Sequence, residues 1–206
     1  MSKGKKSVTL VELLIAISLI FLVVMGISSM EVFSRQHLIG SSRRSLLQNE
    51  LSSALEHISK NIARATGNQS AAGNQPIQLL ANGFSVRVDT KQTMQDLSDD
   101  LVFSYTSTLD PTTGSYTLSC KCVGSDCPAD IVLSSHLRPN VTNGVMTDSI
   151  APDALSGLYI DLPAEDKGTT AEIGLVARYY PDKAISSNNP QIQMKSRMHT
   201  SNASAA

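Results

Sequence analysis

The sequence predicts an α+β protein in which one long N-terminal helix packs on the antiparallel β-sheet of a head. An uncharged run of apolar residues, 13–30, predicts a membrane helix near the start of the chain. Helical spacing of apolar residues continues well past this run, and no proline occurs between Met1 and Gln75. After Gly67 the pattern changes to short alternating runs separated by Asn, Gly, Ser and Pro, which predicts strands and turns.

Composition narrows the classes of function. The chain has 206 residues, with 17 Lys and Arg against 18 Asp and Glu. Three of the cations, Lys3, Lys5 and Lys6, lie in the first seven residues, so the remainder carries 14 positive and 18 negative charges, a difference of −4. Nucleic-acid binding needs a cationic excess to displace counterions, so no nucleic-acid partner is expected. Because the chain has no Trp and few other aromatic residues, an aliphatic core is expected.

The apolar run has the length of a membrane span. Residues 13–30 would extend ~27 Å as a helix, close to the thickness of the hydrocarbon core. The lysines before it should stay in the cytoplasm, which places everything after Met30 outside. Glu12 lies at the cytoplasmic edge, where a carboxylate costs a few kcal/mol unless it has a partner. A secretory signal peptide and a plain signal anchor are the alternatives, although the run is longer than the usual signal-peptide core.

The residues around Glu12 resemble a known processing signal. Ser7-Val8-Thr9-Leu10-Val11-Glu12-Leu13-Leu14-Ile15-Ala16 is similar to the prepilin signal of type IV pilins and type II secretion pseudopilins. The resemblance implies that prepilin peptidase removes residues 1–7 by cutting between Ser7 and Val8, and that the new amine of Val8 is methylated. It also implies that Glu12 assists assembly by pairing with the Val8 amine of a neighbouring subunit in the filament core. The family prefers Gly before the cut and Phe or Met after it.

Beyond the membrane, the same helix should become amphipathic. We expect residues 8–30 to form a transmembrane and filament-core half, and residues 31–66 to form an amphipathic half that ends near Gly67 and Asn68. Gly26 and Gly40 are weak points in this helix. One apolar stripe is expected at Leu47, Leu51, Ala54, Leu55, Ile58, Ile62 and Ala65, with Glu50, Lys60 and Arg64 on the opposite face.

Residues 67–200 should form the β-rich head, followed by a flexible tail, 201–206. Runs 78–81 and 84–88 flank Asn82-Gly83, a strong hairpin signal, and runs 101–105 and 115–119 flank another turn. Further strands are expected at 130–133, 157–162, 171–179 and 191–198, and the last two should pair as a closing hairpin.

Candidate chemistry in the head is sparse. Cys120, Cys122 and Cys127 should lie in an oxidising compartment, where Gly124-Ser125 could turn either Cys120 or Cys122 against Cys127 to form a disulfide. Zinc held by the three thiols and His136, or calcium in the loop of Asp161, Glu165 and Asp166, are weaker alternatives. We expect no cofactor, no bound metal and no enzyme activity, since the catalytic motifs of common enzyme classes are missing from the sequence.

These features together predict a structural subunit of a type IV pilus or a type II secretion pseudopilus. The segment Leu51–Ala65 resembles the first helix of W-type minor pilins and J-type minor pseudopilins, which implies a minor subunit that primes assembly or sits at the tip. The expected partners are other pilin or pseudopilin subunits, prepilin peptidase, the assembly platform and the bacterial inner membrane. The head should lie in the periplasm and then in the filament, at the cell surface in a pilus. A major pilin and a membrane-anchored periplasmic binding or enzymatic domain remain as alternatives.

Overall fold

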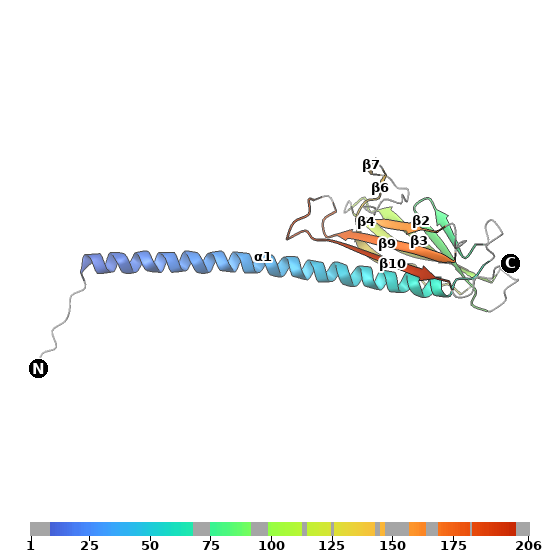
Figure 1. Cartoon of the computed structure of the whole chain (residues 1–206), viewed down its shortest axis with the longest axis horizontal. Coiled ribbons are helices and arrows are strands. Elements are labelled where there is room, and N and C mark those ends of the chain that lie inside the picture. The colour runs from blue at the N-terminus through green and yellow to red at the C-terminus, as the bar shows by residue number, and fades with distance from the viewer. Residues whose placement is uncertain are drawn as a thin grey trace, which may run out of the picture.

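The computed structural model describes residues 9–67, 75–91, 99–112, 115–124, 126–142, 145–146, 157–163, 169–181 and 183–200. The predicted leader with its junction at Ser7 and Val8, and the tail 201–206, lie outside these ranges. Glu165 and Asp166, from the loop weighed as an alternative calcium site, lie outside them as well. Within them, one long helix runs from the N-terminal end of the molecule into a head of antiparallel strands (Figure 1). The predicted α+β fold class is confirmed.

The helix α1 (Leu10–Ala63) has 54 residues and is therefore about 81 Å long. It ends three residues earlier than predicted, because the chain turns toward the sheet at Arg64. The Arg64 and Ala65 amides donate to the carbonyls three residues back, which tightens the last turn. Ala65 then forms an isolated bridge with Val88, so the last residue of the predicted stripe is buried against a strand and not as part of the helix.

The head is built on an eight-stranded sheet with the order β1-β2-β3-β4-β5-β9-β10, and β8 also pairs with β9. A separate two-stranded hairpin, β6 and β7, was not expected from the sequence. The strands in the described ranges are β1 (Ile77–Leu80), β2 (Gly83–Val88), β3 (Leu101–Leu109), β4 (Tyr116–Val123), β5 (Ile131–Leu137), β6 (Val141–Thr142), β7 (Val145–Met146), β8 (Leu158–Asp161), β9 (Thr170–Arg178) and β10 (Gln191–His199).

The predicted hairpins are confirmed, with one shift. β1 pairs with β2, β3 with β4, and β9 with β10, all antiparallel. The turn between β1 and β2 is Ala81-Asn82, because Gly83 already pairs with Leu80. A Cβ at Gly83 would lie 1.7 Å from the Tyr105 carbonyl oxygen, so this glycine permits close approach of two strands and is not a turn residue.

The core lies between the second half of α1 and the concave face of the sheet. The stripe residues Leu47, Leu51, Ala54, Ile58 and Ile62 are fully buried, as predicted. Among the strands, β10 and β5 make the most extensive contacts with the helix. The sheet contributes mainly aliphatic side chains, together with Phe84, Tyr105 and Tyr116.

Both predicted weak points lie in unbroken helix, and they differ in what surrounds them. A Cβ on Gly26 would have nothing within 4 Å, whereas a Cβ on Gly40 would lie 2.2 Å from the Ser187 carbonyl oxygen. Gly40 is buried at the first point where the head touches α1. Because Gly40 has no side chain, the turn between β9 and β10 rests directly on the helix backbone. The edge of the head that faces the N-terminal half of α1 therefore lies at this position.

Candidate functional site: the free half of the N-terminal helix

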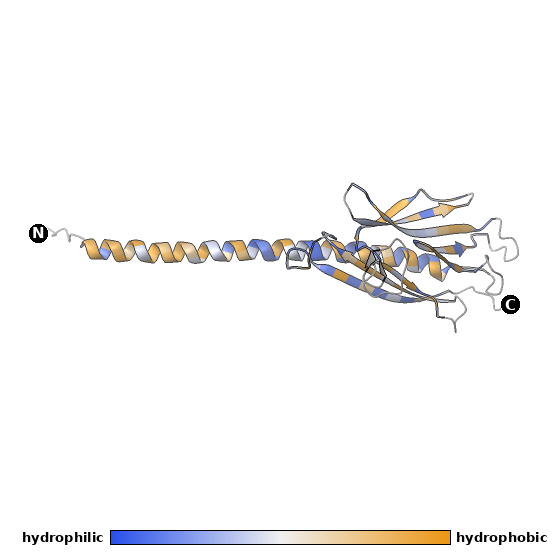
Figure 2. Cartoon of the chain, turned by 90° about the horizontal axis from the view of Figure 1, so that it is seen from above, coloured by the Kyte–Doolittle hydropathy of each residue, from blue (hydrophilic) through white to orange (hydrophobic). Residues whose placement is uncertain are grey.

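Residues Leu10 to Ile39 of α1 project beyond the head. Every residue of this stretch is exposed, whereas burial begins at Gly40. The stretch is predominantly apolar in its N-terminal part, which the hydropathy colouring shows as an almost continuous orange segment (Figure 2). It belongs to the one helix in the described ranges that is long and apolar enough to cross a membrane. Thirty residues at 1.5 Å each give a free length of roughly 45 Å.

Two hydroxyl groups inside this segment are satisfied by the helix itself. The Ser18 hydroxyl donates to the Leu14 carbonyl at 2.9 Å, and the Ser29 hydroxyl donates to the Met25 carbonyl at 2.7 Å. Between Thr9 and Met30, Glu12 is the one charged residue in the sequence. The surface is therefore suited to lipid or to other apolar helices, and it offers a single ionic group for recognition.

Glu12 takes part in a capping box at the start of α1. Its carboxylate accepts hydrogen bonds from the Thr9 amide and the Thr9 hydroxyl, each at 2.9 Å, and its own amide donates to that hydroxyl at 3.3 Å. A carboxylate is favourable here because the first turn of a helix has unpaired amides and the positive end of the helix dipole. Sequence reasoning gave Glu12 a partner outside the helix and missed this local one, although Thr9 and Glu12 have the spacing of a capping box.

Several sets of polar contacts fix the helix to the head within the described ranges. The first is at Arg43, whose guanidinium donates to the Asn188 carbonyl and lies 4.5 Å from the ring centre of Tyr179 and 5.1 Å from that of Tyr180. A guanidinium stacked between aromatic rings keeps its hydrogen-bonding edge available, which suits it to holding a backbone turn.

The second set joins Glu50 of α1 to β5. The Glu50 carboxylate lies 3.0 Å from the His136 Nδ1 and accepts a hydrogen bond of 3.1 Å from the Ser134 hydroxyl. Glu50 therefore faces the sheet, and its predicted position on the solvent face is wrong. His136, the candidate fourth ligand in the weaker zinc alternative, also stacks on Tyr179 with ring centres 5.3 Å apart. Within the described residues, no group of three or more His, Cys, Asp or Glu side chains is placed to hold a metal ion.

The third set lies deep under the helix. The Asn61 side-chain amide donates to the Tyr105 hydroxyl at 2.6 Å, and this hydroxyl lies 3.1 Å from the His57 Nδ1. Burial raises the pKa of Tyr105 well above its ordinary value, so the hydroxyl stays neutral. Burial, and secondarily the charge of Lys60, lowers the pKa of His57. No sequence signal marked these residues, because a buried tyrosine hydroxyl is recognised only when its partners are placed.

The lowered pKa of His57 predicts a loss of head stability in mild acid. The unfolded chain binds a proton at His57 near pH 6.5, whereas the folded head binds it only at lower pH. The stabilisation that depends on a neutral His57 is therefore complete above pH ~6.5. It is lost as the pH falls toward the pKa of His57 in the folded head. The denaturant midpoint of the head, measured by its resistance to proteolysis, should fall across this pH window, and His57→Gln should flatten that pH dependence. An equal fall in the unchanged chain and in His57→Gln would assign the pH dependence to other groups.

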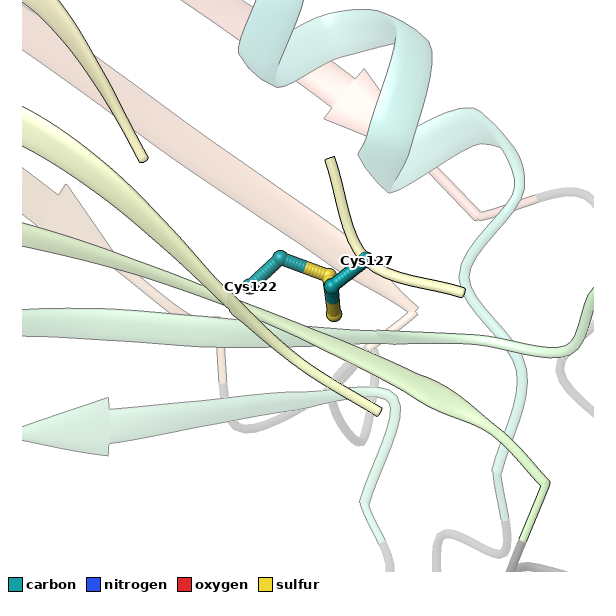
Figure 3. Close-up of a disulfide and its surroundings, with 2 residues drawn as sticks. All are labelled: Cys122 and Cys127. Carbon is teal, nitrogen blue, oxygen red and sulfur yellow. A yellow bond between two sulfur atoms is a disulfide. The ribbon is translucent and has the colours of Figure 1, made fainter. Parts of the chain in front are cut away.

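The cysteines form one disulfide beside a buried thiol. Cys122 and Cys127 are bonded (Figure 3), with their Cα atoms 5.4 Å apart. Cys120 is reduced and 3% exposed, next to Tyr105 in the core. The sequence left open which of the two cysteines on β4 pairs with Cys127. The structure selects Cys122, which lies nearer the end of β4, where Gly124 adopts a positive φ of 151° and reverses the chain.

The buried thiol should be inert until the head unfolds. Burial raises the pKa of Cys120 to about 11, so it holds almost no thiolate at neutral pH. Full-chain protein in detergent should show no alkylation by iodoacetamide when native and one alkylated cysteine per chain in denaturant, counted by intact mass. Rapid alkylation of the native chain at Cys120 would contradict the burial of this thiol.

The disulfide should stabilise the head. Cys122→Ser/Cys127→Ser should lower the free energy of unfolding by about 2 kcal/mol.

Comparisons with known proteins give no relative for this chain. No protein-family model, no curated protein and no solved structure matches it.

Proposed function

We propose that this chain is a structural subunit of a type IV pilus or type II secretion pseudopilus, and that it is a minor subunit that primes assembly or occupies the tip. One observation carries the proposal. The first thirty residues of α1 stand clear of their own head, and their N-terminal part exposes an apolar surface on which Glu12 is the one charged residue as far as Met30. A head of this size gains nothing from a helix twice as long as its core needs, whereas a filament assembled through its helices requires one.

The free helix would serve two environments in turn. In the inner membrane its apolar side chains face lipid, and in the filament they face the same surfaces of neighbouring subunits. Cleavage between Ser7 and Val8 by prepilin peptidase would supply a free amine close to Glu12. A carboxylate and an ammonium group buried together fix the register between two helices, because either one left unpaired in an apolar core is costly. In this way Glu12 would select the correct neighbour as the assembly platform lifts each subunit from the membrane.

The capping box is the specific evidence for the alternative function, a permanent membrane anchor. Because Thr9 satisfies Glu12 within its own helix, the carboxylate does not require a partner subunit, and a permanent membrane anchor for a periplasmic domain would have the same local geometry. The two functions differ in the fate of residues 1–7 and in whether the chain leaves the membrane.

The test is intact-mass and N-terminal peptide analysis of the protein from membranes and from sheared filaments. A mature chain that begins at methylated Val8 and is recovered in filaments at low abundance supports the minor-subunit proposal. The same chain at high abundance identifies the main subunit of the filament. A chain that keeps Ser2 or Met1 and stays in the membrane fraction contradicts assembly and favours the permanent anchor.

A further inference from the structure

The turn between β9 and β10, residues 179–181 and 183–190, is the part of the head nearest to the free half of α1. Both views show it extending along the helix toward the N-terminal end (Figures 1 and 2). It meets the helix at two points: the Ser187 carbonyl sits against Gly40, and the Asn188 carbonyl accepts from Arg43. The β9–β10 turn is therefore held at the level where the free half of the helix ends.

The β9–β10 turn is ordered by its own hydrogen bonds. The side-chain amide of buried Asn189 donates to the carbonyls of Tyr180, Lys183 and Ala184 at 3.0–3.1 Å. The Arg178 guanidinium donates to the Lys183 carbonyl at 2.9 Å. The backbone is thus fixed, while the side chains at its tip are exposed, including Ile185 at 60%. A rigid loop with an exposed apolar tip is suited to contact a surface without losing much conformational entropy.

Beside these contacts, a cleft of about 330 Å³ is lined by residues of both the β9–β10 turn and the helix. Its lining combines one guanidinium, one imidazole and several hydroxyl groups, which are the side chains that bind phosphate groups. Arg44 makes no ion pair with any residue in the described ranges. The residues of the cleft are His37, Gly40, Ser41 and Arg44 from α1, and Ile185, Ser186, Ser187, Pro190 and Gln191 from the turn and β10.

No carboxylate lines the cleft, and Arg44 is the permanently charged side chain in its lining. Glu50, farther along α1, is paired with His136 of β5. Between Gln36 and Asn49 the helix carries Arg43 and Arg44 and no carboxylate. The tip of the turn adds Lys183, whose nearest acidic neighbour in sequence is Asp182, outside the described residues. The rest of the chain beyond the leader has an acidic excess, so this cationic patch is local. A local cationic patch beside an exposed apolar side chain matches the chemistry of an anionic lipid surface.

The length of the free helix places this patch at the height of lipid headgroups. From Leu10 to Ile39 the helix measures roughly 45 Å, which equals the thickness of a bilayer including both headgroup layers. Apolar side chains remain exposed up to Leu38 and Ile39, immediately below the head. Side chains on a helix lean toward its N-terminus, so His37 and Arg44 lean toward the membrane.

We propose that the cleft and the tip of the β9–β10 turn bind the phosphate-bearing headgroups of anionic phospholipids in the outward-facing leaflet. Ile185 enters the headgroup layer while Arg44 and Lys183 contact phosphates, so the head rests on the membrane in a fixed orientation. The proposal requires that α1 spans the membrane, which belongs to the proposed function, but it does not require assembly into a filament.

The chain offers a clean optical test because it contains no Trp. Ile185→Trp provides a single reporter at the tip. Val123→Trp is the matched control, since Val123 is 59% exposed and lies on β4, near the end of the head where α1 finishes. Each full-length variant is placed in nanodiscs of phosphatidylcholine, with or without phosphatidylglycerol, and its emission and quenching by headgroup-labelled lipids are recorded. Protease protection in the same samples measures separately whether α1 has inserted into the bilayer.

With phosphatidylglycerol present, the tip reporter should shift to the blue and be quenched, and the control reporter should not change. Arg44→Gln/Lys183→Gln should weaken docking by roughly 5-fold for each cation removed, and 1 M salt should also release the head. Lys60→Gln/Arg64→Gln, which removes the same charge at the far end of α1, should have no effect.

Equal quenching of the two reporters, or no dependence on phosphatidylglycerol, would overturn headgroup binding. So would the same spectral change on adding inorganic phosphate to pure phosphatidylcholine discs, because the cleft would then be a site for soluble anions. If α1 inserts normally and the head does not bind the headgroups, the lipid proposal is wrong and the proposed function still stands. If α1 does not insert, both are wrong.

Discussion

A chain carrying Glu12→Gln is expected to insert into the membrane and fold its head normally, yet to be nearly missing from filaments. Glutamine keeps an oxygen that can accept from the Thr9 amide, so the capping box survives. It removes the charge that would pair with the Val8 amine of a neighbouring subunit. Leaving one member of a buried ion pair alone costs about 3–5 kcal/mol, which corresponds to roughly 100- to 4,000-fold weaker association. Quantitative immunoblots of sheared filaments and membranes measure this ratio.

Thr9→Ala is the matched control for that experiment. It deletes the hydroxyl that bonds the Glu12 carboxylate and amide, at a cost of about 1 kcal/mol to the helix start, and it leaves the charge in place. Under the proposed function, Thr9→Ala assembles and Glu12→Gln does not. The reverse result would show that Glu12 serves as a helix cap and has no pairing role.

Leu47→Ala is expected to lower the free energy of unfolding of the head by about 2–5 kcal/mol. Leu47 is fully buried at the first core position of α1, and truncation leaves a cavity between the helix and the sheet. Its neighbour Leu46 is 43% exposed, so Leu46→Ala removes the same atoms from the same helix at a cost of about 1 kcal/mol or less.

The denaturant dependence of proteolysis in detergent measures both leucine variants against the unchanged chain. The two should separate clearly, since they differ in burial and not in chemistry. Equal destabilisation by the two would mean that the head does not derive its stability from packing on this face of α1.

Much of the fold could be predicted because its local signals agree with its packing. The apolar stripe and the closing hairpin of β9 and β10 follow from residue spacing alone. Boundaries were less certain where tertiary contacts decide them. The helix stops at Ala63 because Val88 offers Ala65 a strand partner, and Gly83 belongs to a strand because Tyr105 passes so close.

The candidate site was predictable only where it is local. The apolar run and Glu12 are visible in one stretch of sequence, and the structure adds the capping contact with Thr9. The contacts that fix the head to the helix join residues far apart in the chain. Glu50 and His136 are 86 residues apart, and Arg43 and Asn188 are 145 apart, so neither pair has a sequence signature. The disulfide partner was undecided because both candidates lie on the same face of β4.

The contact between α1 and β10 has a consequence for the order of folding. The helix α1 leaves the ribosome well before β10, and β10 is among the strands that cover the helix most extensively. The stripe from Leu47 to Ile62 must therefore stay uncovered by β10 while more than a hundred residues are synthesised. Non-local closure of this kind is slow and exposes apolar surface during the wait. A chain truncated before Gln191 should accordingly be a substrate for chaperones and proteases, even though its apolar N-terminal helix is intact.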